Sequence, residues 1–138
     1  MGIELPKDYR PSADEPFMND MQKEYFRQKL LAWREELLRD SEETLDNLKE
    51  GGMTVPDISD RASAEADKAL ELRTRDRMRK VISKIDVALG KIDDGTYGYC
   101  EETGEPIGLE RLIARPIATL SIEAQERHER MEKTYSDD

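Results

Sequence analysis

Hydrophobic residues recur every three or four positions along two long stretches of the chain, and charged residues fill the positions between them. The stripe of the first stretch consists of Phe26, Leu30, Trp33 and Leu37, joined by Leu31, Leu38, Leu45 and Leu48. That of the second consists of Ile82, Ile85, Leu89 and Ile92, with Ala62, Ala69 and Leu72 expected to face inward at its other end. This spacing is typical of amphipathic α-helices.

Residues between the two stretches predict where the helices begin and end. Asn19, three places before Gln22, is a suitable N-cap, and the first helix should end near Lys49 or Glu50, before Gly51-Gly52. Pro56 blocks helix before it, so Asp57, Ser59 or Asp60 should cap a second helix that runs to about Ile92. Two such helices fold back antiparallel and form an arm of roughly 45 Å.

The rest of the chain predicts smaller elements. Residues 1–18 contain Pro6, Pro11 and Pro16 and should be irregular. Residues 95–120 should form a β-hairpin around the turn 101–106, followed by an irregular crossing. Ser121 should cap a last helix that runs to about Lys133, within a terminal segment 121–138. We therefore predict a mainly α protein, with a coiled-coil hairpin over 19–94 and its tip at 51–62.

Composition narrows the classes of function. Of the 138 residues, 36% are apolar and 39% charged, which is too polar for a compact globule but normal for exposed helical hairpins. The net charge of −10 argues against general nucleic-acid binding. We expect neither a membrane span nor a signal peptide, and Cys100, the single cysteine, excludes an intramolecular disulfide. These features favour a soluble cytoplasmic protein.

Residues 73–84 reverse the sign of the charge locally. They include six bases and one acid: Arg73, Arg75, Arg77, Arg79, Lys80 and Lys84 against Asp76. One interpretation is a solvated helix face paired with acids of the first helix. The other is a surface that meets an acidic partner or phosphate groups. We find no constellation of catalytic residues and no Gly-rich phosphate loop, so we do not expect an enzyme.

Several motifs resemble one family. They are Phe26–Trp33, the tip Pro56–Ala62, Leu72–Arg77, Tyr97–Cys100 and Ile107–Pro116, in order and with matching gaps. Together they span about four fifths of the chain and resemble the DksA/TraR family of bacterial regulators that bind RNA polymerase, most closely its DksA branch. The resemblance implies a coiled-coil arm that enters the secondary channel of RNA polymerase and alters the lifetime of promoter complexes together with the alarmone ppGpp.

The resemblance also implies functional residues. The tip residues Asp57, Asp60, Arg61 and Ala62 would lie near the active centre of the polymerase, although acids in a first helical turn are also common caps. A ppGpp pocket shared with the polymerase maps to Val81, Lys84, Arg111 and Arg115, and a further basic position of that pocket is Gln125 here. We expect a monomer in the bacterial cytoplasm that binds no specific DNA sequence and no membrane.

The chain departs from the family pattern at its zinc site. The four cysteine positions of the family are occupied here by Cys100, Thr103, Ser121 and Ala124. Because structural zinc needs about four nitrogen or sulfur ligands, we predict a degenerate, zinc-free finger. Its fold should depend on apolar packing of Tyr97, Tyr99, Ile107, Leu109, Leu112 and Ile122. Cys100 is expected to be a small buried side chain rather than a redox group.

Two other functions remain possible. A transcript-cleavage factor would use the same channel, with tip acids that help the polymerase's own metal to hydrolyse RNA. A coiled-coil adaptor would show a continuous apolar stripe on the outer face of the hairpin, where this sequence has charges. The tip spacing and the altered finger favour the DksA branch over the cleavage factor.

Overall fold

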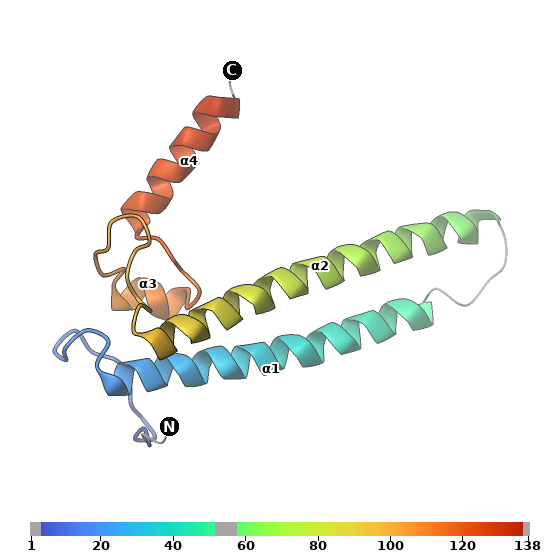
Figure 1. The fold of residues 1–138 in the computed structure, drawn as a ribbon. Coiled ribbons are helices and arrows are strands. Elements are labelled where there is room, and N and C mark those ends of the chain that lie inside the picture. Colours follow the sequence, from blue (N-terminus) through green and yellow to red (C-terminus); the bar gives the residue numbers. More distant parts are fainter. Residues whose placement is uncertain (1–3, 52–57, 137–138) are drawn as a thin grey trace. The chain divides into compact units, whose positions relative to one another are not determined.

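The chain is organised around two long helices. The computed structural model describes residues 4–51 and 58–136, and the side chains of 4–47 and 62–134. In the described part there are four helices and no strand: α1 (Asp20–Gly51), α2 (Ile58–Asp94), α3 (Leu109–Ala114) and α4 (Ile122–Ser136). Figure 1 shows α1 and α2 side by side and antiparallel. The mainly α fold with a long helical hairpin is therefore confirmed.

Two compact units divide the chain. The hairpin unit is Leu31–Asp86, and the base unit combines Met1–Leu30 with Val87–Asp138. Since α1 spans Asp20–Gly51 and α2 spans Ile58–Asp94, each long helix contributes residues to both units. The base unit therefore joins segments from the two ends of the sequence.

The start of α1 is fixed by side chains, as the sequence predicted. Asn19 Oδ1 accepts the backbone N–H of Gln22 at 2.8 Å. Gln22 is fully buried; its Oε1 accepts the N–H of Met18 at 2.7 Å and its Nε2 donates to the carbonyl of Ser12 at 3.2 Å. These bonds attach the irregular N-terminal segment to α1. In contrast, α2 begins at Ile58, so Ser59 and Asp60 lie in its first turn rather than at its N-cap, and Asp57 lies outside the described residues.

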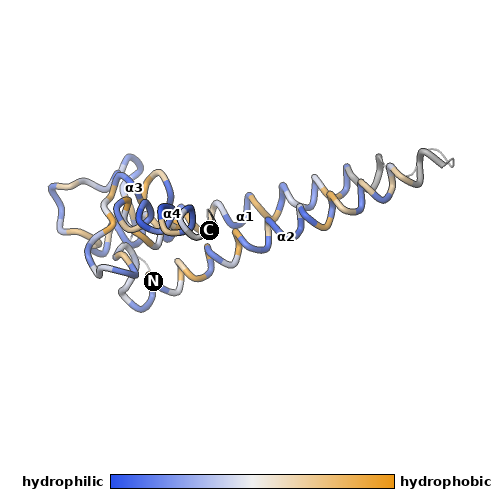
Figure 2. The backbone as a smooth tube through the Cα atoms, turned by 90° about the horizontal axis from the view of Figure 1, so that it is seen from above, coloured by the Kyte–Doolittle hydropathy of each residue, from blue (hydrophilic) through white to orange (hydrophobic). Residues whose placement is uncertain are grey.

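The seam of the hairpin unit is in part the one predicted, since Leu45 and Ile85 are buried and Trp33, Leu37 and Ile82 are partly buried. On α2 the less exposed positions of this unit step by four and three along Asp67, Glu71, Thr74, Met78, Val81 and Ile85, and Ile82 is also partly buried. Ala62, Ala69 and Leu72, predicted to face inward, are exposed, and so are Leu31 and Leu38 on α1. Two helices share only one narrow seam. Because several residues of this seam are polar, the spacing of apolar residues alone did not reveal it. Figure 2 shows apolar positions recurring at intervals along both helices.

The core of the base unit forms around α1 and the last turns of α2. Phe26, Leu30 and Leu112 are fully buried, and the rings of Phe26 and Tyr97 lie 5.5 Å apart. The hydroxyl of Tyr97 donates to the carbonyl of Pro116 at 2.8 Å. This core connects α1 with the segment that leads to α4.

The segment after α2 corrects two predictions. The predicted β-hairpin is reduced to one antiparallel bridge, between Tyr99 and Pro106. Residues 109–114, predicted as the end of a strand and an irregular crossing, form α3 instead. Gly108 precedes this helix with φ 107°, and Pro116 follows it closely. Six residues are too few to give a clear helical period, so sequence analysis missed the element.

Candidate functional site

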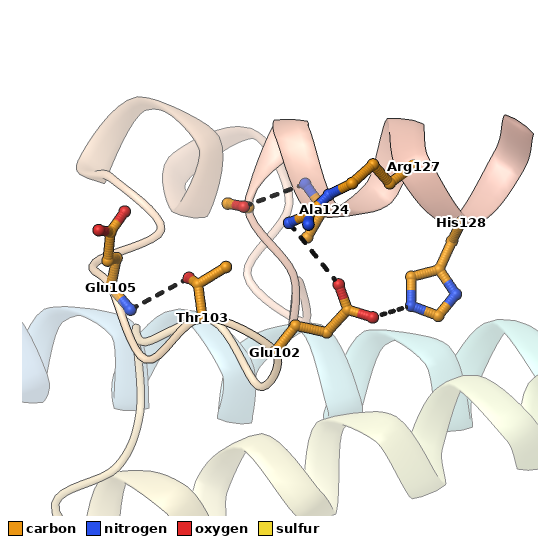
Figure 3. A network of polar contacts seen from close by, with 7 residues as sticks. Glu102, Thr103, Glu105, Ala124, Arg127 and His128 are labelled. Carbon is orange, nitrogen blue, oxygen red and sulfur yellow. Dashed lines mark hydrogen bonds and ion pairs between the residues drawn. The ribbon is translucent and has the colours of Figure 1, made fainter.

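The four family cysteine positions of the finger, three of them altered here, lie close together in the base unit. Thr103 Oγ1 accepts the N–H of Glu105 at 3.2 Å, and Ser121 Oγ accepts the N–H of Ala124 at 3.2 Å (Figure 3). The second bond caps α4, as predicted. Ala124 is fully buried, and Cys100 is 3% exposed. The side chains at these positions therefore organise the turn and the helix start.

The thiol of Cys100 is buried near polar groups of the finger turn and of the start of α4. Burial raises the pKa of this thiol, but bonds from the backbone of Ser121, from Thr103 and from the backbone of Glu102 outweigh burial and lower the pKa to about 6. The prediction of a buried cysteine is confirmed.

The apolar packing around the finger is only partly as predicted. Tyr97 and Leu112 are buried, and Ile107 and Leu109 are partly buried. Ile122 is 55% exposed and Tyr99 36% exposed, so these two do not belong to the core. The inward position in the first turn of α4 is occupied by Ala124 instead, two residues after Ile122, because only one side of this helix meets the base.

A network of polar contacts joins the finger turn to α4. Glu102 Oε1 contacts His128 Nε2, and Glu102 Oε2 lies 4.0 Å from an Arg127 guanidinium nitrogen (Figure 3). Lys91 at the end of α2 pairs with Glu101 in the same turn. All these groups are partly exposed, so each pair contributes little free energy alone. Sequence analysis missed the network because its partners are up to 26 residues apart.

Two of the predicted ppGpp residues lie on one turn of the base unit. Arg115 is the C-cap of α3, and its N–H donates to the carbonyl of Arg111 at 2.7 Å. Arg111 Nε donates to the carbonyl of Leu120 at 3.0 Å, while the side chain of Arg115 is exposed. Val81 and Lys84 belong to the hairpin unit, where Lys84 is exposed. The Gln125 amide donates to Glu129 at 3.2 Å. A pocket shared by these residues stays a prediction.

Lys29 on α1 is a basic residue that sequence analysis missed. Its Nζ donates to the carbonyl of Ile113 at 2.7 Å and lies 5.9 Å from the centre of the Tyr25 ring. The contact joins residues 84 positions apart, which no local pattern reveals. Lys29 therefore lies at the C-terminal end of α3, beside the turn that contains Arg111 and Arg115.

A stripe of four exposed cations follows one flank of α2. It consists of Arg73, Arg77, Lys80 and Lys84, which step by four, three and four and therefore lie on one side of the helix. Among the described residues none of the four forms an ion pair, whereas Arg75 pairs with Glu71 and Arg34 with Asp86. Pairing with acids of α1 therefore does not account for this stripe.

Little of the tip lies within the described residues. Asp57 lies outside them, and for Asp60 and Arg61 the structure describes the backbone alone, in the first turn of α2. Ala62 is exposed. The role of the tip acids stays a prediction.

These elements define a class of protein whose chain combines a long helical hairpin with a small helical base unit that carries a finger-like turn. Residues 22–92 match the family model "DnaK suppressor protein DksA, N-terminal domain", and residues 95–130 match "Prokaryotic dksA/traR C4-type zinc finger". The chain belongs to the DksA family. Members of this family are transcription factors, not enzymes.

Individual relatives support the same assignment. The chain is 68% identical over 131 residues to "RNA polymerase-binding transcription factor DksA" of Caulobacter vibrioides, which covers 95% of this chain and 92% of the relative. The Escherichia coli K12 protein of the same description is 42% identical, covering 91% and 83%. Transcription factor DksA2 from Pseudomonas aeruginosa superimposes with a TM-score of 0.78 at 42% identity, covering 90% of this chain and 94% of that structure.

These comparisons correct the prediction that no zinc is bound. The match of residues 95–130 to a C4-type zinc finger favours zinc binding, and the prediction is wrong on that finding. It relied on the altered ligand positions, where Cys100 is the one thiol and Ala124 presents a methyl group. No group of three or more His, Cys, Asp or Glu side chains gathers among the described residues, so these four positions do not themselves supply a C4 ligand set.

None of the helices in the described ranges is long and apolar enough to cross a membrane.

Proposed function

We propose that this chain binds RNA polymerase through its secondary channel and regulates transcription initiation together with ppGpp. The observation that carries the proposal is the 68% identity over 95% of the chain to a relative described as RNA polymerase-binding. The similarity includes both long helices and the finger, so the parts needed for the family's activity are present in order.

The hairpin unit has the properties that such a channel requires. It is a slender pair of helices joined by one narrow seam, with most other positions exposed. Its exposed apolar side chains, such as Leu38 and Leu72, are separated by charged residues rather than joined in a continuous outer stripe. This distribution favours insertion between charged surfaces over self-association, and hence polymerase binding over the adaptor function.

In this proposal the tip and the base have separate roles. Asp57 and Asp60, with Arg61 and Ala62, act near the active centre and change the lifetime of promoter complexes. Lys84, Arg111 and Arg115 bind the phosphates of ppGpp together with polymerase groups, and Val81 is an apolar member of the same pocket. Support for the second role comes from the exposed side chains of Lys84 and Arg115 and from the backbone bond between Arg115 and Arg111. Phosphate groups favour such charge-assisted bonds.

The test replaces charge at the tip while keeping shape. Asp57→Asn and Asp60→Asn should still copurify with RNA polymerase and melt close to the parent, because loss of a cap costs only about 1 kcal/mol. Both should lose most of the effect on the half-life of open complexes at a single promoter. Asp40→Asn, which removes an exposed acid of α1 away from the tip, is the matched control and should keep parental activity. A polymerase-bound Asp60→Asn protein with parental activity would contradict the proposed role of the tip.

A further inference from the structure

The last turn of α3 is held from two sides. The carbonyl of Ile113 is one of the final four that a helix leaves without an internal donor, and it accepts a bond from Lys29 Nζ at 2.7 Å. Three residues on, the carbonyl of Pro116 accepts the Tyr97 hydroxyl at 2.8 Å. Between these two contacts lies Arg115, whose own N–H and carbonyl are bonded to Arg111 and Ala118.

These contacts use the backbone of Arg115 and not its side chain, so its guanidinium group can bind a ligand. Its side chain is exposed, and no described residue forms an ion pair with it. Arg111 uses its Nε for the carbonyl of Leu120, so its terminal nitrogens keep their donors for other partners. The two guanidinium groups start one helical turn apart, a spacing at which both can reach adjacent phosphate groups.

Lys29 adds a positive charge to this turn. Its ammonium group has three donors, of which Ile113 takes one, and the contact is exposed to solvent. The cation also lies at the negative end of α3, which is its favourable position. The Tyr25 ring lies 5.9 Å from the ammonium and limits its directions.

We propose that Lys29 is a positioning residue of the phosphate-binding surface. Through the carbonyl of Ile113, it holds the last turn of α3 so that Arg111 and Arg115 meet the phosphates of ppGpp in a fixed direction. This inference rests on the proposed function and assigns to the same surface a residue outside the finger and the hairpin unit.

The test uses the full-length protein in complex with RNA polymerase and measures binding of radiolabelled ppGpp, with binding to polymerase alone subtracted. Lys29→Met keeps the aliphatic stem and removes the donor and charge; it should weaken ppGpp binding about fivefold, in the range expected for one charged hydrogen bond at an exposed site. Lys29→Arg keeps both and should restore most of the affinity. Lys23→Met, on the same helix but paired with Asp20, is the matched control and should bind ppGpp like the parent.

A second background separates positioning from a general loss of structure. Because Lys29 acts in part through Arg115, the further effect of Lys29→Met on ppGpp binding in an Arg115→Ala protein should be clearly smaller than about fivefold. If Lys29→Met weakened ppGpp binding equally in the parent and in the Arg115→Ala protein, or if Lys29→Met bound ppGpp like the parent, the role of Lys29 would be contradicted. The proposed function would not be affected by either result. If Arg115→Ala itself bound ppGpp like the parent, the proposed pocket would fail and this inference with it.

Discussion

Buried polar side chains in the base unit each have a defined partner. Gln22 bonds the backbone of Met18 and Ser12, and Tyr97 bonds that of Pro116. No buried side-chain nitrogen or oxygen among the described residues lacks a hydrogen bond. Sequence analysis predicted the Asn19 and Ser121 caps because they act within three residues, but partners 10 to 84 residues away, such as those of Gln22, Tyr97 and Lys29, have no local signal.

Tyr97→Phe should lower the free energy of unfolding by about 1–2 kcal/mol, because it leaves the buried carbonyl of Pro116 without its donor. Burial also raises the pKa of Tyr97, which agrees with a hydroxyl that stays protonated inside the core. Urea denaturation measures the change. Tyr99→Phe, at a partly exposed ring, is the control and should change stability much less. Equal losses for the two variants would contradict the assigned role of the bond.

The lowered pKa of Glu15 should make the stability of the fold depend on pH. The Ser12 N–H bond at 3.0 Å, assisted by Tyr9 and Gln22, lowers the pKa of Glu15 below its ordinary 4.5, although desolvation opposes the shift. Because the pKa of Glu15 is lower in the folded state than in the unfolded state, its ionised carboxylate stabilises the fold at pH above the unfolded-state pKa. This stabilisation is lost as the pH falls through the folded-state pKa. The melting temperatures of the parent and Glu15→Gln should therefore converge below about pH 4.5. Asp14→Asn, at an exposed neighbour, should keep the acid dependence of the parent.

At the scale of elements, periodicity predicted the two long helices and α4 to within three residues at each described end. It failed where an element is short, as in α3, and where polar residues occupy the seam of a helix pair, as at the partly buried Asp67, Glu71 and Thr74. The N-terminal segment was expected only to be irregular, yet Met18 is buried against the finger turn, and this contact depends on tertiary packing.

Gly98 packs closely against Phe17 and Met18 of the N-terminal segment. It has φ +93°, and an added Cβ would lie 3.1 Å from Met18 Cγ and 3.2 Å from Phe17 Cζ. Gly104 also has positive φ, +75°, but open space around it. Gly104→Ala should therefore cost about 1 kcal/mol for backbone strain alone, and Gly98→Ala roughly 1 kcal/mol more for overpacking. Thermal unfolding measures both, and Phe17→Ala should relieve part of the excess in Gly98→Ala. Equal costs for the two glycines would contradict the close packing.

On the scale of the whole molecule, charge is unevenly distributed. The chain has a net charge of −10, yet four exposed cations align along α2 without described partners. Attraction between this stripe and an acidic surface would guide one side of the hairpin unit toward its partner, while the net charge opposes nonspecific contact with nucleic acid. Sequence analysis identified the basic segment but not which of its members share a flank free of ion pairs.

Neutralising two members of the stripe should weaken polymerase binding. The double variant Arg77→Gln/Lys80→Gln should bind RNA polymerase roughly three- to tenfold more weakly at low salt, with a smaller loss as salt rises. Arg79→Gln with Lys68→Gln removes the same charge from the other flank of α2 and should bind like the parent. Salt-dependent affinity measurements compare the two, and equal effects would show that total charge, not the stripe, decides binding.

The base unit combines two segments that are far apart in the sequence, so its core cannot form early in synthesis. The ribosome makes Phe26 and Leu30 early, but their partner Tyr97 and the fully buried Leu112 emerge more than sixty residues later. During that interval the nascent chain can pair only its own helices, within Leu31–Asp86. The apolar face of the first helix therefore stays exposed until these residues have been made, and a chain truncated before Pro116 would be a natural substrate for chaperones and proteases.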